Sequence, residues 1–317
     1  MKLVKRVVDL LNVFIALLVA PIAYVQVRLG PERMPLTYRI WDAVGLTPLR
    51  HHYYQPVFNV NTIPEDVWTK KDPMLGIDWD EEGQLALLSQ FNYQNELERV
   101  PVNEVKGSLE FYHDNNSFGS ADAEMLYNMV RFHKPGRVIE IGSGYSTRMM
   151  KKALDENKKE GFQSSHICIE PYEMPWLESL GLDEVVREKV ESVNPELFSS
   201  LQENDILFID SSHVLRLGGD VFAEYLRILP SLNPGVVVHI HDIFLPYEYP
   251  RSWVVEHRRF WTEQYILQAF LAFNSSFRVL AAVHWLYRDR SEQLASACPV
   301  YAKLNKGGGS FWMKKIK

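Results

Sequence analysis

The chain has 317 residues, of which 46% are hydrophobic and 23% are charged, and its formal net charge at pH 7 is -6. This length accommodates one large domain with an extension or two small domains, and the composition is ordinary for a protein with a buried core. The acidic balance, without a basic patch interleaved with aromatic residues, argues against a nucleic-acid partner. Neither Cys168 nor Cys298 belongs to a CxxC pattern, which argues against a zinc ribbon or a redox pair and favours a reducing compartment.

The N-terminal segment, residues 1–30, is strongly apolar. No formal charge occurs from Leu10 to Val27, and basic residues flank this run on both sides. A bilayer is crossed by about 20 apolar residues, so a transmembrane anchor fits, while Pro21 also allows a monotopic hairpin or an interfacial helix. A cleaved signal peptide is disfavoured because no clean A-x-A site follows, and a buried core helix is a further alternative. We expect membrane attachment with the remainder on the cytoplasmic face, although positive charge at both ends leaves the orientation open.

Residues 31–109 are expected to form an extension of packed loops, because they are rich in Pro, Trp and Tyr. Within them, the apolar residues of "EEGQLALLSQFNYQNELERV" recur at helical spacing and predict a helix. We expect the remaining residues, 110–317, to form the domain that carries the chemistry.

From residue 120 onward, helical segments alternate with short apolar segments. Helices are predicted over "SADAEMLYNMVRFHKP", "STRMMKKALDENKKEG", "GGDVFAEYLRILPSL" and "WTEQYILQAFLAF". Strands are predicted over "RVIEIG", "HICIEPY", part of "VVREKVESV", "NDILFIDSS" and "GVVVHIHDIF". This alternation predicts a mostly parallel sheet with helices on both faces, whose ligands bind beyond the carboxyl ends of the strands.

Two further strands are predicted near the end of the chain, over "FRVLAAVHWLY" and "GGGSFWMKKIK", with no helical pattern between them. Without a crossover helix, they are expected to form an antiparallel pair at the edge of the sheet. The expected fold class is therefore α/β, with a doubly wound, mostly parallel seven-stranded sheet and an antiparallel C-terminal pair.

The loop in "VIEIGSGYSTRMM" resembles half of a dinucleotide-binding fingerprint. That fingerprint requires G-x-G-x-x-G, but Thr147 stands at the third glycine. Glu140 precedes the first glycine, where it would repel a pyrophosphate and suit a cationic head such as an α-amino group. Glu170 ends the next strand, where a carboxylate can accept hydrogen bonds from both ribose hydroxyls. The loop is therefore predicted to hold a nucleoside joined to an amino-acid head.

A second group of polar residues follows the next two strands. "FIDSSHV" places Asp210 at a strand end and His213 three residues later, and "HIHDIF" places His241 and Asp242 at the following strand end. Neighbouring strands lie about 4.8 Å apart, so Asp210, His241 and Asp242 are expected to converge. Two carboxylates and an imidazole suit a divalent metal such as Mg²⁺ or Mn²⁺, or the acids only accept hydrogen bonds from backbone amides. His239 lies deeper on the same strand and is interpreted as a core residue.

The segments "VIEIGSGYST", "CIEPY", "DILFIDSSH" and "GVVVHIHDIF", in this order and spacing, resemble class I S-adenosylmethionine-dependent methyltransferases. The likeness covers roughly residues 110–317 and is closest to a bacterial branch with many sugar and small-molecule O-methyltransferases. The resemblance implies that the methionine part of the cofactor lies among Glu140, Gly142, Ser143 and Gly144, that Glu170 binds the ribose, and that Asp210 lies beside the cofactor.

In metal-dependent sugar O-methyltransferases that this chain resembles, an acid at the position of Asp210 binds the metal and a histidine at the position of His213 acts as base. Two adjacent acids end the following strand in that family, whereas this chain has His241 and Asp242. The predicted metal ligands of this chain therefore include a histidine in place of one acid. The alternative to a role of His213 as base is that it caps the segment that follows it. A metal would lower the pKa of a sugar hydroxyl, which is a poor nucleophile near neutral pH.

The resulting hypothesis is a membrane-associated methyltransferase that acts on an oxygen of a glycan, a glycolipid or a related hydroxylated metabolite. "LPYEYPRSWVVEHRRFWTEQY" is a candidate acceptor-binding segment, because its Tyr, Trp and Arg residues suit sugars or acidic groups, or it packs at a domain surface. Two other hypotheses remain: a nicotinamide-dependent oxidoreductase on a similar sheet, and a membrane-docked binding subunit without turnover. The acceptor and the oligomeric state are not predicted.

Overall fold

The computed structural model describes residues 2–172 and 174–317, and it divides into two units, Met1–Pro64 and Glu65–Lys317. The first unit contains α1 (Lys2–Arg33), α2 (Pro35–Ala43) and a short 3-10 turn, η1 (Val60–Thr62). The segment Arg6–Arg33 is long and apolar enough to cross a membrane, with a mean hydropathy of 2.2 and apolar side chains that are exposed. The helix continues through Pro21 and is interrupted at Gly30, whose φ of 77° is not helical.

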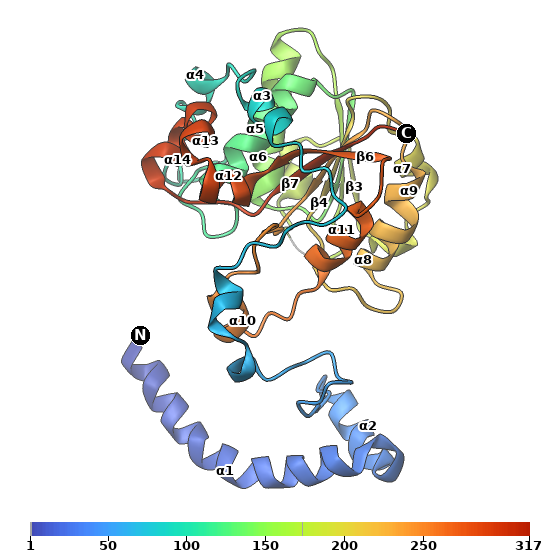
Figure 1. The fold of residues 1–317 in the computed structure, drawn as a ribbon. Coiled ribbons are helices and arrows are strands. Elements are labelled where there is room, and N and C mark those ends of the chain that lie inside the picture. Colours follow the sequence, from blue (N-terminus) through green and yellow to red (C-terminus); the bar gives the residue numbers. More distant parts are fainter. Residues whose placement is uncertain (1, 173) are drawn as a thin grey trace. The chain divides into compact units, whose positions relative to one another are not determined.

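The second unit is built around a seven-stranded sheet of order β3-β2-β1-β4-β5-β7-β6 (Figure 1). Its strands are β1 (Arg137–Ile141), β2 (Ser165–Ile169), β3 (Glu184–Val186), β4 (Ile206–Ile209), β5 (Val237–Ile240), β6 (Phe277–Ala282) and β7 (Phe311–Lys315). The first five strands pair in parallel, and β7 pairs antiparallel with both β5 and β6. The predicted α/β fold with an antiparallel C-terminal pair is thus confirmed.

Helices cover both faces of this sheet (Figure 1). One face carries α5 (Ser120–His133), α6 (Tyr145–Lys159), α12 (Val283–Asp289), α13 (Ser291–Ala297) and α14 (Pro299–Leu304). The other face carries α8 (Asp220–Ala223), the π-helical turn η5 (Glu224–Ile228), α9 (Leu229–Ser231) and α11 (Glu263–Leu271). The remaining elements of this unit are α3 (Glu81–Leu88), α4 (Gln94–Leu97), α7 (Glu196–Ser199), α10 (Arg251–Val255) and the 3-10 turns η2 (Glu65–Trp68), η3 (Leu177–Leu180) and η4 (Val190–Ser192).

The core lies between the sheet and its two helical layers. Every residue of β4 and β5 is buried, as expected for central parallel strands with helices on both sides. Trp285 of α12 and Trp312 of β7 are among the largest fully buried side chains.

Two sequence-based expectations differ from the structure. The single helix expected around residues 81–100 is two helices, α3 and α4, separated by a turn that buries Phe91. The final two strands are separated by α12, α13 and α14, and β6 ends at Ala282. These helices have seven, seven and six residues, too few turns for a clear helical period to emerge.

Candidate active site

The ends of β1, β4 and β5 align side by side. The N–H of Gly142 donates to Ile169 O, that of Asp210 to Ile141 O and that of His241 to Ile209 O, at 3.0, 2.8 and 2.8 Å. Each bond continues the parallel ladder one residue past a strand end. The register therefore places the loop glycine, the acid and the imidazole in one row across the carboxyl edge of the sheet.

Gly142 is required by close packing at this row. Its φ is 78°, and a Cβ at this position would lie 1.9 Å from the carbonyl oxygen of Asp210. Thr147 closes the loop, because its Oγ1 accepts the N–H of Gly144 at 3.0 Å. The N–H of Ser143 donates to Glu170 Oε2 at 3.3 Å, which ties the glycine loop to the end of β2.

Beside this loop lies a cavity of about 380 Å³, called here the loop cavity. Three predicted ligand residues, Gly142, Glu170 and Asp210, line it together with Ser211, Ser212 and residues of 189–191. The second oxygen of Glu170 accepts the N–H of Tyr172 at 2.9 Å. A tight glycine turn, a strand-end carboxylate and a polar wall fit an adenosine-type ligand with a cationic tail.

Glu140 lies in the interior of β1 and does not line the loop cavity. It is fully buried, and its Oε2 accepts from His166 Nε2 at 2.7 Å and from Cys168 Sγ at 3.3 Å. Burial and the neighbouring Glu140 carboxylate raise the pKa of the Cys168 thiol. This differs from the sequence-based prediction that Glu140 faces the amino-acid head of the cofactor, because the face that its side chain takes is set by the pairing of β1 with β2.

His213 stands where the predicted site residues meet. Its Nε2 lies 3.4 Å from Asp210 Oδ1 and 3.7 Å from Asp242 Oδ2, and its Nδ1 donates to Glu263 Oε2 at 2.8 Å. His241 Nε2 lies 3.6 Å from Asp242 Oδ1. His213 and Asp242 have φ values of 60° and 55°, in the left-handed region that non-glycine residues rarely adopt. Strained backbone conformations of this kind, here at the residues that follow β4 and β5, recur in active sites.

The charges of this cluster are strongly coupled. Burial alone would lower the pKa of His213, but hydrogen bonds to Asp210 and Glu263 outweigh it and raise the pKa well above its usual value. Burial alone would raise the pKa of Asp210, but His241 and His213 outweigh it and lower the pKa to about 2. Burial raises the pKa of Asp242, and the nearby imidazoles offset this only in part. The resting cluster is therefore a protonated imidazole held by carboxylates.

The predicted metal ligands do not gather as tightly as a buried group elsewhere in the sheet. Among the described His, Cys, Asp and Glu side chains, the group whose ligand atoms all lie within 4.8 Å of one another is Glu140, His166 and Cys168. The 2.7 Å contact between His166 and Glu140 is a hydrogen-bond distance. Asp210, His241 and Asp242 still present two hard oxygen ligands and an imidazole at one strand edge, and their role as metal ligands stays a prediction.

His239 is buried in the core, as predicted, but the expectation that its ring nitrogens are satisfied there is not met by the residues that the structure describes. Its ring stacks on Phe208 at a centroid distance of 4.0 Å and an interplanar angle of 4°. Neither ring nitrogen has a hydrogen-bond partner among the described residues, and burial lowers the pKa of His239 well below its usual value.

On the other side of Asp242 lies a second cavity of about 600 Å³, called here the aromatic cavity. It is lined by Asn116, Ser117, Gly119, Asp122, His241, Asp242, Phe244, Trp253, His257, Arg259, Trp261, His284, Tyr287 and Gly307–Gly309. Its wall at Gly309 is held by Asp122, whose oxygens accept the N–H groups of Gly309 and Ser310 at 3.0 and 2.9 Å.

Two features of this site were not predicted from the sequence. Glu263 opens α11, fifty residues beyond His213, and nothing local marks it as the partner of that imidazole. Asp122 lies in the first turn of α5, and nothing local marks it as the acceptor for the backbone of Gly309 and Ser310. The glycines of 307–309 permit this close approach, since a Cβ on Gly308 would lie 2.3 Å from Asp122 Oδ1.

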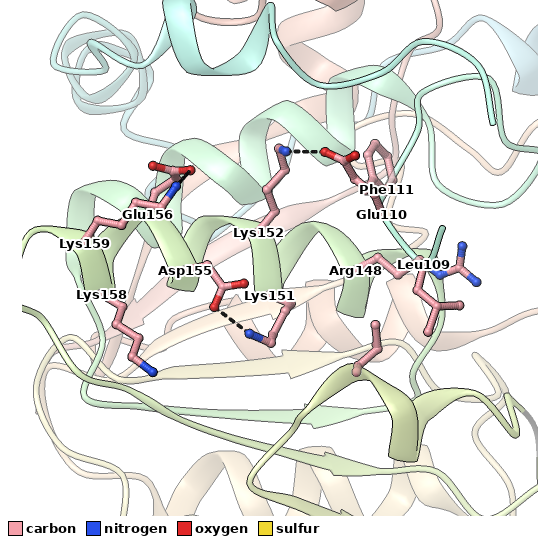
Figure 2. A pocket seen from close by; sticks show the side chains of 11 residues that line it. Leu109, Glu110, Phe111, Arg148, Lys151, Lys152, Asp155, Glu156, Lys158 and Lys159 are labelled. Atoms are coloured by element: carbon pink, nitrogen blue, oxygen red, sulfur yellow. Dashed lines mark hydrogen bonds and ion pairs between the residues drawn. The ribbon is translucent and has the colours of Figure 1, made fainter. Parts of the chain in front are cut away.

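A further hollow, of about 740 Å³, has no strand-end residue in its lining. It lines the outer face of α6, where Lys151, Lys152 and Lys159 project (Figure 2). These lysines are paired with Asp155, Glu110 and Glu156, at 2.5, 2.6 and 2.6 Å. We interpret this surface as a solvated charged helix face.

Comparison with known proteins places these features in a family. Residues 139–243 match the family model of a methyltransferase domain. An uncharacterized protein of Archaeoglobus fulgidus is 30% identical over 166 residues, which cover 49% of this chain and 74% of the relative.

Solved structures of similar chains include two O-methyltransferases. One, from Streptomyces achromogenes, is involved in tomaymycin synthesis and was solved with S-adenosylmethionine; it is 14% identical, with a TM-score of 0.37 over 76% of this chain and 92% of that chain. The other, from Bacillus cereus, was solved with S-adenosylhomocysteine; it is 15% identical, with a TM-score of 0.35 over 73% and 91%.

The matched residues 139–243 contain the end of β1, the glycine loop, and the strand ends of β4 and β5. The chain therefore carries a methyltransferase domain, matched over residues 139–243, on a Rossmann-like sheet.

Proposed function

We propose that this protein transfers a methyl group from S-adenosylmethionine to a hydroxyl oxygen of a sugar, glycan or glycolipid. One observation carries the proposal: His213 Nε2 contacts one acid from each cavity. Asp210 lines the loop cavity and Asp242 lines the aromatic cavity. A methyl donor in the first cavity and an acceptor in the second would therefore meet at an imidazole that exchanges a proton.

The transfer balances with the groups at this point. An acceptor oxygen attacks the methyl carbon of the sulfonium in line, a new C–O bond forms, and the C–S bond breaks with its electron pair going to sulfur. The hydroxyl proton passes to Nε2 of the neutral His213 ring, which is the form that predominates once the pH exceeds the raised pKa of His213, and S-adenosylhomocysteine leaves. Because such a displacement mainly requires alignment, the main tasks of the protein are to position two ligands and to accept one proton.

Glu263 supports the proposed role of His213 as base. Its fully buried carboxylate accepts from Nδ1, and the hydroxyl of Tyr225 donates to its other oxygen at 3.1 Å. The backbone N–H groups of Thr262 and Glu263 also donate to the carbonyl of His213, at 2.9 and 3.1 Å. These bonds keep Nε2 directed toward Asp210 and Asp242, and they stabilise the imidazolium that forms during transfer.

The lining of the aromatic cavity supports a carbohydrate acceptor. Trp253, Trp261 and Tyr287 give the cavity aromatic surface, which suits the C–H groups of a sugar ring. Asp242, His257 and Asn116 supply hydrogen-bonding groups for its hydroxyls.

A divalent metal remains part of the proposal. The donor set of Asp210, His241 and Asp242 suits a hard ion such as Mg²⁺ or Mn²⁺. Such an ion would supply Lewis-acid polarisation of the acceptor hydroxyl. It would compete with the proton of His213 for the same two carboxylates, because both acids already face Nε2.

We also propose that α1 attaches the protein to the cytoplasmic face of a membrane. The apolar segment Arg6–Arg33 and its exposed side chains support the membrane attachment in this proposal. Membrane attachment favours a lipid-linked or surface glycan as acceptor, because the enzyme and such a substrate would share one surface.

Mass spectrometry of cell-envelope glycans and lipids, with and without the gene, tests the function. We expect the deletion strain to lack one CH₂ unit on a specific glycan, and a copy carrying Asp210→Asn not to restore it. Restoration by that variant would favour a binding subunit without turnover. Saturable binding of NAD without binding of S-adenosylmethionine to the purified protein would favour an oxidoreductase.

A further inference from the structure

The aromatic cavity contains an arginine without a carboxylate partner. The Cζ atom of Arg259 lies 4.6 Å from the ring centroid of Trp253 and 4.9 Å from that of Trp261. Within the described residues no acid forms an ion pair with Arg259, whereas Arg131, Arg251 and Arg290 all pair with glutamates. Two indoles contact the guanidinium, and its N–H groups have no hydrogen-bond acceptor among the described residues, so they remain available for a ligand.

The local backbone keeps Arg259 in this position. Its N–H donates to Trp253 O at 2.9 Å, which closes a turn after α10. The preceding residue, Arg258, has a φ of 56°, so the backbone turns here and the side chains of Arg258 and Arg259 take different directions. Arg259 lines the cavity, and the exposed Arg258 does not.

The acids of the cavity are occupied by other donors. Asp122 accepts two backbone N–H groups from Gly309 and Ser310, and Asp242 lies beside His213 and His241. Arg259 therefore contributes a positive charge that no acid of the cavity neutralises directly. An anion on the ligand is the missing partner, because a guanidinium binds carboxylates and phosphates through two parallel N–H donors.

Trp261 lies next to both the proposed base and the arginine, and so relates the position of the anion to that of the reacting oxygen. Its ring centroid is 4.3 Å from that of His213, and the guanidinium of Arg259 contacts the same indole. One indole thus separates the proposed base from the free charge. An anionic group on the methylated sugar itself, or on the adjoining residue, spans this separation.

We infer that the acceptor is an acidic carbohydrate, and that Arg259 binds its carboxylate or phosphate group while the neighbouring hydroxyl faces His213. This inference rests on the proposed function, whose acceptor class it narrows. Uronic acids and sugar phosphates share the required chemistry, and the test below separates them.

Titration of the full-length protein in detergent, with S-adenosylhomocysteine present, tests this directly. Glucuronate, glucose 6-phosphate and glucose are compared as ligands by calorimetry and by intrinsic tryptophan fluorescence. We expect at least one anionic sugar to bind about tenfold tighter than glucose, equivalent to ~1.4 kcal/mol, and the tighter of the two identifies the carboxylate or the phosphate. This preference weakens with added salt.

Two variants make the assignment specific. Arg259→Gln should reduce the affinity for the anionic sugar to that for glucose, with glucose binding unchanged, and Arg258→Gln should behave as the original protein. Equal affinity for charged and neutral sugars, no saturable binding of any of the three, or an equal loss in both variants would overturn the inference. Binding of S-adenosylhomocysteine, measured on the same samples, tests the proposed function separately. If the protein binds S-adenosylhomocysteine but shows no preference for anionic sugars, only the acidic acceptor is refuted. If it does not bind S-adenosylhomocysteine, the methyltransferase proposal is refuted.

Discussion

The contact between Glu263 and His213 provides a quantitative test of the proposed base. Replacement of Glu263 by Gln keeps a hydrogen-bond acceptor near Nδ1, where the present distance is 2.8 Å, but removes the buried charge. A hydrogen bond to a charged partner contributes about 1.5–3 kcal/mol, against about 0.5–1.5 kcal/mol for a neutral one. The variant should therefore lose ~1.4 kcal/mol of stabilisation of the imidazolium, a factor of about ten in its proton affinity.

The sign follows from the state in which His213 acts. Its pKa is raised, so the protonated ring dominates below that pKa, and the neutral ring that accepts a proton appears only as the pH rises through it. Methyl transfer should therefore increase with pH in the original protein. In Glu263→Gln the rising limb should move to lower pH by about one pH unit, and the plateau rate should fall because the base is weaker and less firmly oriented.

The assay is release of S-adenosylhomocysteine from a cell-envelope glycan extract across a pH series, with the imidazole of His213 followed in parallel by NMR titration. Glu256→Gln, an exposed glutamate before α11, is the matched control and should leave the profile unchanged. An unshifted limb in Glu263→Gln, or the same shift in both variants, would refute the assignment of His213 as the base held by Glu263.

Three further outcomes are expected. Gly142→Ala should abolish binding of S-adenosylhomocysteine in calorimetry and lower the melting temperature, since its Cβ would lie 1.9 Å from Asp210 O; Gly136→Ala, whose Cβ meets its nearest atom at 3.5 Å, should do neither. If a metal is bound, dialysis against EDTA should remove activity and Mn²⁺ should restore it. Asp242→Asn should then weaken Mn²⁺ binding measured by electron paramagnetic resonance, while cofactor binding persists. Activity that is indifferent to EDTA would exclude an exchangeable ion. Deletion of residues 1–30 should shift the protein from the carbonate-resistant membrane fraction to the supernatant, and recovery of both forms in the supernatant would contradict membrane attachment.

Features set by strand order were predictable from the sequence. Apolar runs that end in Gly142, Asp210 and His241 become neighbours because parallel strands place their carboxyl ends at one edge. This local pattern is the same in any sheet of this topology, so the loop and the acids could be located without coordinates.

Features set by long-range packing were not predictable. Glu263 meets His213 because α11 folds back over η5, a contact with no local signature. Glu140 faces His166 and Cys168 because the register of β1 and β2 pairs residues 140 and 168. The helices α12–α14 are each too short to show a period. Side-chain direction and contacts between distant segments thus required the structure.

The hydroxyl of Thr147 has a consequence for what this scaffold can become. The hydroxyl oxygen accepts the backbone N–H of Gly144, and this N–H is a donor that phosphate-binding turns leave free for their ligand. A variant designed to bind nicotinamide coenzymes would first need this N–H freed from Thr147, for example by the substitution Thr147→Gly. The Thr147 hydroxyl therefore disfavours binding of a pyrophosphate at this turn.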